Sequence, residues 1–330
     1  MSLLRNDDDG RIRAPWRLLV HGLLFLLTTS VLSGIFSALF EFIGGSEARI
    51  LPGEDGLVLP AGLLLAWALG GLGGAFVSTA IAAQYLDRRS PRDLGLRLDR
   101  AWWADFRFGL ALGGVMVGGI VAVEVIMGWM EITGSGVVEA GPLRFLGEFA
   151  VASIAFVCVG VYEEVVVRGY QMTNLAEGLR PGRGREVVGI IAALIASSVA
   201  FGLLHGVNPG YSALALVNIT LIGMLVLGLG YALTGRLGLP IGLHTSWNFA
   251  LSFIFGLPVS GVKAGEYPVL LTRGVGPEPW TGGSFGPEGG LLGTVSILAG
   301  LVALVVWVRL REGRIAVHQQ LAQPPGEARN

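Results

Sequence analysis

Uninterrupted apolar runs of about 20 residues recur along the chain, and each is long enough to cross the hydrocarbon core of a membrane. Backbone polar groups inside lipid must be satisfied within their own segment, and barrel strands alternate in polarity, so these runs should be helices. Charged residues make up only 14% of the chain, against about 25% in soluble domains. The sequence therefore predicts an all-α, polytopic transmembrane helical bundle. Its eight expected spans lie at about 18–40, 57–86, 105–130, 145–169, 187–206, 212–234, 240–256 and 289–310, the seventh being short.

The distribution of arginine predicts how this bundle sits in the membrane. Arginines gather before the first span, between the second and third, between the fourth and fifth, and after the last, and cytoplasmic loops are enriched in them. We expect residues 1–17 to be a cytoplasmic segment, 18–310 the bundle, and 311–330 a disordered cytoplasmic tail, with both termini cytoplasmic. The segment 257–288, rich in glycine and proline, reads as an irregular outer loop. The arginine-rich and glycine-rich composition favours the inner membrane of a bacterial cell.

Glycine accounts for 52 of the 330 residues, and several glycines stand four apart inside apolar runs. This spacing lets two helix backbones approach closely in lipid. Each pair either marks such a contact or simply reflects how common glycine is in this chain. The pairs are Gly70 with Gly74, Gly109 with Gly113, and Gly114 with Gly118.

Charged side chains are costly inside a span and mark functional sites by default. The fourth span contains Glu163, Glu164 and Arg168. Glu164 and Arg168 stand four apart with the acid first, which is the favoured direction for an ion pair on a helix. Glu163 points about 100° away and has no evident partner, so it is a candidate general base. The alternative is a structural ion pair near the cytoplasmic end of the span, with Glu163 in contact with solvent.

Two later spans contribute three further polar residues. His205 lies near the end of a mostly apolar helix, and His244 and Asn248 stand one turn apart on one helix face. Taken singly, they are consistent with a packing histidine and with hydrogen bonds between helices. Together with Glu163 they supply a base, two imidazoles and an amide, which suffice to activate water and to stabilise a tetrahedral intermediate. Ser197 and Ser198 lack the Gly-x-Ser-x-Gly context of a nucleophile, and no His-Glu-x-x-His motif is present.

In these residues the sequence resembles the CPBP family, also called the Abi family, which includes the CAAX endopeptidases. The family pattern is E-E-x-x-x-R, then F-x-x-x-H, then H-x-x-x-N or H-x-x-x-D. The resemblance covers about 145–256, and every motif position is met. The matching residues are Glu163 and Glu164 with Arg168, Phe201 with His205, and His244 with Asn248.

This resemblance implies an intramembrane endopeptidase that acts on a membrane protein or peptide in the lipid bilayer. Glu163 would activate the water, His205 would position it or share its proton, and His244 with Asn248 would form the oxyanion site. The supporting residues would be Glu164 and Arg168. The eukaryotic relatives imply a prenylated CAAX substrate, but a bacterial source gives no reason to expect prenylated proteins. The net charge of −1 gives no reason to expect nucleic acid as a partner.

Some descriptions of the family treat its members as metalloproteases. Glu163, His205 and His244 could in principle form a three-ligand zinc site. In that arrangement His244 and Asn248 lose their separate oxyanion role, so a glutamate-activated water without a metal is the favoured mechanism. Further alternatives are a proton-coupled transporter, whose spans also carry Glu, Arg and His, and a non-catalytic scaffold or immunity protein.

The motifs must also meet at one depth in the membrane. At 1.5 Å per residue, Glu163 and His205 share a depth only if the fourth helix continues to about residue 179. His244 lies only about 12 Å in from Arg236 by the same rise. Either the seventh helix begins before its predicted boundary, or the site spreads over some depth.

Overall fold

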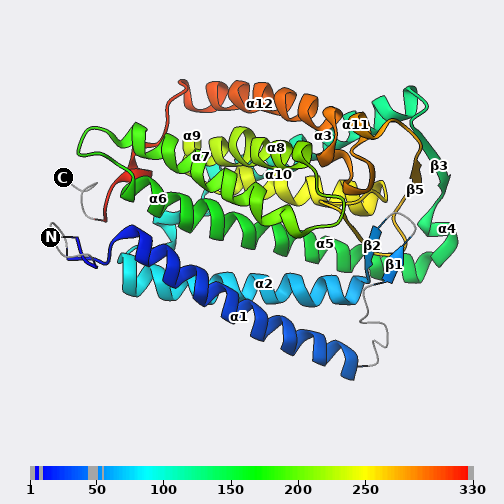
Figure 1. Cartoon of the computed structure of the whole chain (residues 1–330), viewed down its shortest axis with the longest axis horizontal. Coiled ribbons are helices and arrows are strands. Elements are labelled where there is room, and N and C mark those ends of the chain that lie inside the picture. The colour runs from blue at the N-terminus through cyan, green and yellow to red at the C-terminus, as the bar shows by residue number, and fades with distance from the viewer. Residues whose placement is uncertain (1–3, 7–9, 44–50, 54–55, 326–330) are drawn as a thin grey trace.

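The computed structural model describes residues 4–6, 10–43, 51–53 and 56–325, and its helices lie side by side in a bundle (Figure 1). Within these residues seven helical segments are long and apolar enough to cross a membrane, so the predicted helical membrane bundle is confirmed. Three of the segments contain π-helical stretches. The seven are α1 (Ala14–Phe42), α2 (Ala61–Ile81) extended to Asp87, α3 (Arg100–Ile126), α5 (Pro142–Glu164) continued into α6 (Thr173–Gly178), α7 (Glu186–Leu204), α8 (Ala213–Leu221) continued into α9 (Leu229–Thr234), and α12 (Leu291–Glu312).

The seventh predicted span, at 240–256, is a shorter helix inside the bundle. It comprises α10 (Gly238–Phe249) and a π-helical turn at Ala250–Ile254. Its main helical neighbours are α3 and α5, and every residue of α10 except Ser246 and Phe249 is buried. A helix that is buried nearly all round has no broad lipid-facing side. Its polar residues therefore face other helices or a cavity.

The fourth span is longer than predicted. Instead of ending near residue 169, α5 continues through a π-helical stretch at Val165–Met172 into α6 and ends at Gly178. This is the continuation that Glu163 and His205 need in order to share a depth. The π-helical stretch begins directly after Glu164, and such stretches are frequent at functional sites.

Two of the three predicted glycine pairs lie at close helix contacts, and the third does not. A Cβ atom at Gly113 would come within 2.6 Å of the carbonyl oxygen of Leu243, so only glycine lets α3 and α10 approach this closely. Gly114 and Gly118 have no atom of another element within 4 Å of such a Cβ. The contacting pairs are Gly70 with Gly74, against α1, and Gly109 with Gly113, against α10.

The two ends of the bundle differ in structure. In Figure 1, α1 begins and α12 ends at the same end. The opposite end carries a cap with more regular structure than the irregular loop that the composition of 257–288 suggests. In this cap β2 pairs antiparallel with β1 and parallel with β4, and β3 pairs antiparallel with β5. The elements of the cap are β1 (Leu51–Gly53), β2 (Gly56–Leu59), β3 (Met130–Gly134), α4 (Gly136–Ala140), β4 (Val262–Ala264), β5 (Leu271–Gly274) and α11 (Glu278–Thr281).

The C-terminal tail departs from the predicted disorder. A 3₁₀ turn at Gln319–Ala322 buries Leu321 and Ala322 against the end of the bundle. The backbone N–H of His318 donates to the carbonyl of Ala232 at 2.7 Å, which ties the tail to α9. Two apolar residues in a polar stretch show no helical periodicity, so the sequence gives little sign of this docking. Residues 326–330 of the tail and parts of 1–17 (1–3 and 7–9) lie outside the described residues.

Candidate active site

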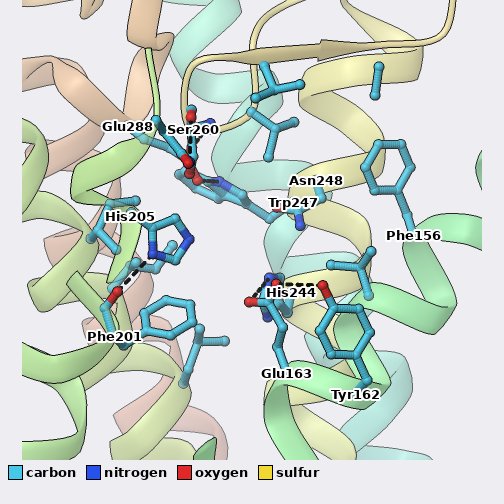
Figure 2. Close-up of a pocket in the computed structure, with 18 of the residues that line it drawn as sticks. Phe156, Tyr162, Glu163, Phe201, His205, His244, Trp247, Asn248, Ser260 and Glu288 are labelled. Atoms are coloured by element: carbon cyan, nitrogen blue, oxygen red, sulfur yellow. Dashed lines mark hydrogen bonds and ion pairs between the residues drawn. The ribbon is translucent and has the colours of Figure 1, made fainter. Parts of the chain in front are cut away.

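A cavity of about 330 Å³ lies between α2, α5, α7, α10 and the cap (Figure 2). The structure brings four of the predicted site residues to its wall: Glu163 from α5, His205 from the end of α7, and His244 with Asn248 from α10. The two supporting residues lie behind the wall. Glu164 and Arg168 are almost fully buried and do not line the cavity.

Glu163 is the member of the glutamate pair that faces the cavity. Its side chain is 23% exposed, whereas that of Glu164 is fully buried. The hydroxyl of Tyr162 donates to Oε1 of Glu163 at 3.2 Å, and Oε2 lies 3.7 Å from Nε2 of His244. A carboxylate that is accessible from the cavity and close to an imidazole can accept a proton from a molecule bound there.

Glu164 holds His244 from behind and thereby fixes the orientation of its ring. Oε1 of Glu164 lies 2.8 Å from Nδ1 of His244 and 2.8 Å from a guanidinium nitrogen of Arg168. Because an ionised carboxylate only accepts, Nδ1 carries the hydrogen, and Nε2 is left for the cavity. The guanidinium also lies 4.4 Å over the ring of Phe201 and donates to the carbonyl of Gly223 at 3.3 Å. The predicted Glu164–Arg168 pair is thus present, and it connects α5 to three other helical segments.

His205 approaches from the other side of the cavity (Figure 2). It directly follows the last residue of α7, and Nδ1 donates to the carbonyl of Phe201 at 2.7 Å. This bond leaves Nε2 unprotonated in the neutral ring and able to accept a hydrogen bond. Within the described residues, no hydrogen bond or ion pair joins His205 to Glu163 or His244. The structure therefore places His205 on the same cavity without direct contact to the other two.

Asn248 lies one turn beyond His244 on α10, and both residues line the cavity, as expected for a shared helix face. The residue is 6% exposed, and its side chain makes no hydrogen bond to the described part of the chain. Burying an amide without a hydrogen-bond partner is unfavourable. The amide is therefore available to donate to a molecule in the cavity.

Sequence reasoning missed Glu288, a buried carboxylate that also lines the cavity. Its Oε1 accepts from the indole N–H of Trp247 at 2.8 Å. Oε2 accepts from the backbone N–H and the hydroxyl of Ser260, at 2.6 and 2.8 Å. Glu288 thus fastens α10 to the cap. Glu288 lies in a segment without helical or strand periodicity. The only signal in the sequence was an acidic residue surrounded by glycines and a proline. The same wall includes Tyr162, whose bond to Glu163 the sequence did not suggest.

The residues proposed for zinc do not form a three-ligand set. In the described part of the chain, no group of three His, Cys, Asp or Glu residues is placed to hold a metal ion. Nε2 of His244 faces Glu163, but His205 projects from the opposite side of the cavity (Figure 2). The arrangement of these donors therefore does not fit the expected ligand triad.

Comparison with known proteins agrees with the placement of the motifs. Residues 145–250 match the family described as type II CAAX prenyl endopeptidase Rce1-like, and the segment contains all three motifs. No curated protein and no solved structure matches the chain. The family match supports a CAAX-type intramembrane protease in general, and the apolar helices make the chain an integral membrane protein. Over residues 145–250, about a third of its length, the chain thus matches the Rce1-like CAAX protease family, which confirms the resemblance that the three motifs predicted.

Proposed function

We propose that the protein is an intramembrane endopeptidase that hydrolyses a peptide bond with a water molecule activated by Glu163. One observation carries this proposal. The Glu163 carboxylate lies 3.7 Å from the imidazole of His244, in a cavity whose wall also holds His205 and Asn248. A base, two imidazoles and an amide from three helical segments therefore share one space. This is the set that addition of water to a carbonyl group needs.

In the proposed reaction, Glu163 takes a proton from water while the water oxygen attacks the carbonyl carbon of the peptide. The carbonyl oxygen becomes an oxyanion, toward which the amide of Asn248 and a protonated Nε2 of His244 would donate. Collapse of the intermediate breaks the C–N bond. Glu163 then returns the proton to the leaving amine, so the products are a carboxylate and a new amino terminus.

The remaining residues of the motifs would position these groups. Nε2 of His205 is able to accept a hydrogen bond and would hold the water or share its proton. Glu164 fixes the His244 ring through Nδ1, and Arg168 balances the charge of Glu164. A catalytic imidazole held through its second nitrogen by a buried carboxylate keeps its tautomer and its direction.

The cavity wall favours a substrate with apolar side chains. Trp67 of α2 and Phe156 of α5 line it as well, together with Leu59 of the cap. A cavity of about 330 Å³ is within the range of small ligand pockets and large enough for a few residues of an extended peptide. We therefore propose a membrane protein or membrane-bound peptide as the substrate, with the scissile bond beside Glu163.

We also propose that the protein occupies a bacterial inner membrane with both termini cytoplasmic. The arginine-rich turns after α2, between α6 and α7, and after α9 lie at the end of the bundle where α1 begins and α12 ends. This common location is what the preference of arginine for cytoplasmic loops requires.

The deciding experiment compares Glu163→Gln with the wild-type chain in proteoliposomes. The substrates are two internally quenched peptides that end in a Cys-aliphatic-aliphatic-X sequence, one farnesylated and one not. We expect cleavage by the wild type and none by Glu163→Gln. Glu124→Gln, which removes a buried carboxyl of α3 that does not line the cavity, should keep full activity.

Three results would contradict the proposal. Full activity of Glu163→Gln would remove this residue as the base. Ion or solute flux in the same liposomes, with no cleavage of either peptide, would favour a transporter. Biological function retained in His205→Ala/His244→Ala would favour a non-catalytic scaffold.

A further inference from the structure

A second cavity, of about 540 Å³, lies at the end of the bundle where α1 begins and α12 ends. Its walls come from the turn between α2 and α3, from Thr234–Arg236 after α9, and from the docked tail. Its lining residues do not overlap with those of the cavity that contains Glu163. A ligand of this second cavity would therefore bind away from Glu163.

Five arginines line this cavity, here called the arginine pocket, and only two of them have acidic partners in the part of the chain that the structure describes. Arg89 lies 2.7 Å from a carboxylate oxygen of Glu177, and Arg236 lies 2.6 Å from both Asp105 and Glu312. The remaining three are exposed, and their side chains make no hydrogen bond or ion pair within the described residues. These three are Arg88, Arg92 and Arg97.

Two aspartates also line the arginine pocket, but both are engaged in capping helical turns. Oδ2 of Asp93 accepts from the backbone N–H and the hydroxyl of Ser90, at 2.8 and 2.9 Å. Oδ1 of Asp99 accepts from the backbone N–H of Trp102 at 2.9 Å. Neither carboxylate is bonded to an arginine of the pocket. The three arginines without acidic partners in the described chain also outnumber these two aspartates, so the pocket keeps an excess of positive charge, which attracts anions.

The pocket walls are built by ordered structure. Arg88 adopts the left-handed conformation, with φ 59° and ψ 37°, which residues other than glycine, asparagine and aspartate rarely do. Strained backbone of this kind clusters at ligand sites and switch regions. In the docked tail, the carbonyl of Gln323 accepts from Arg89 at 2.8 Å, and Leu321 is buried.

We propose that the arginine pocket binds a phosphate-bearing anion. Arginine presents a planar fork of donors that matches phosphate oxygens, and three such groups without partners among the described residues line one cavity. Trp103 is 47% exposed near the start of α3, as expected for a residue at the membrane interface. The phosphate could therefore belong to the headgroup of an anionic phospholipid or to a free phosphate compound.

Binding is tested on the full chain, purified in neutral detergent at low salt, with two probes. Inorganic pyrophosphate is titrated by calorimetry, and phosphatidylglycerol is compared with phosphatidylcholine by native mass spectrometry. We expect Arg92→Gln/Arg97→Gln to weaken binding by roughly tenfold or more. The matched variant Arg185→Gln/Arg309→Gln removes two exposed arginines outside the pocket and should stay within about twofold of wild type, because distant exposed charges are screened.

Each outcome decides the proposal. Binding of pyrophosphate alone identifies a free phosphate compound, preference for phosphatidylglycerol alone identifies a lipid headgroup, and either result supports the site. No binding of either probe to the wild type, or equal losses in the two variants, overturns it. A second measurement needs no variant: a bound probe should protect Arg92 and Arg97, but not Arg185 and Arg309, from phenylglyoxal. Equal modification of all four would also overturn the site.

Discussion

Nδ1 of His244 lies 2.8 Å from Oε1 of Glu164, although the two residues are 80 positions apart in the chain. This bond joins α10 to α5 at the place where α5 becomes π-helical. The same oxygen also accepts a hydrogen bond from Arg168, so Oε1 of Glu164 has two donors, one on each of these residues. Glu163, its neighbour, has an oxygen directed at the cavity side of the same ring. Two adjacent glutamates are thus given different tasks by their orientation.

The first prediction concerns the free energy of unfolding of Glu164→Gln. This change leaves the buried guanidinium of Arg168 without its ion-pair partner, so we expect a loss of about 3 kcal/mol and a clearly lower Tm. Thermal unfolding in detergent, followed by light scattering or tryptophan emission, measures it. The matched control is Glu163→Gln, a partly exposed carboxylate whose replacement should cost less than about 1 kcal/mol. Equal Tm values for the two variants would show that Glu164 is not the structural member of the pair.

The second prediction separates catalysis from stability at Asn248. Because its amide has no partner in the described chain, Asn248→Ala leaves no orphaned group and should change Tm little. If the amide stabilises the oxyanion, kcat should fall by about 10²–10³ with little change in KM. Initial rates across a range of peptide concentrations measure both constants.

A second buried asparagine provides the control. The amide of Asn218 donates to the carbonyl of Gly290 at 2.8 Å and its oxygen accepts from Thr294 at 2.7 Å. Asn218→Ala should therefore lower Tm while leaving kcat per folded molecule close to wild type. The oxyanion role of Asn248 is wrong if its variant behaves like that of Asn218.

Local spacing in the sequence was sufficient to predict several relationships. Four-residue spacing correctly predicts the Glu164–Arg168 pair and the shared position of His244 and Asn248 on the cavity wall. An α-helix has 3.6 residues per turn, so residues four apart lie on the same face. The length of apolar runs predicts the bundle. Whether Glu163 belongs to the reaction stays a prediction, since its placement beside His244 is geometry and not activity.

Other features depended on tertiary contacts that no local pattern encodes. The Glu164–His244 bond joins helices whose register is set by packing, and Glu288 is placed by the cap. The burial of Leu321 depends on a surface built by segments far from it in sequence. The seventh run is predicted as a short span, but its position inside the bundle depends on tertiary packing, because glycines of α3 let α10 approach closely.

The third prediction tests Glu288 as the fastening between α10 and the cap. Glu288→Ala removes the acceptor of the Trp247 indole and of two donors on Ser260, and leaves buried donors unsatisfied. We expect a loss of about 2–3 kcal/mol in stability and a drop in peptidase rate, because Trp247 adjoins Asn248. Hydrogen exchange should rise around residues 258–261. Glu278→Ala, at an exposed position of the same cap, should change neither quantity, and unchanged exchange in Glu288→Ala would contradict this role.

The fourth prediction concerns two adjacent glycines of α3 that differ only in what they face. A Cβ at Gly113 would lie 2.6 Å from the carbonyl oxygen of Leu243 and 3.0 Å from the backbone nitrogen of Trp247. These are backbone atoms of α10, so Gly113→Ala must displace the helix that carries His244. We expect a loss of about 1–3 kcal/mol in stability, and a fall in rate that exceeds the unfolded fraction. Gly114→Ala meets no atom of another element within 4 Å and should leave Tm and rate unchanged or slightly improved. Because the two substitutions are chemically identical and adjacent, any difference between them measures the α3–α10 contact itself, and equal behaviour would mean that this contact does not position the site.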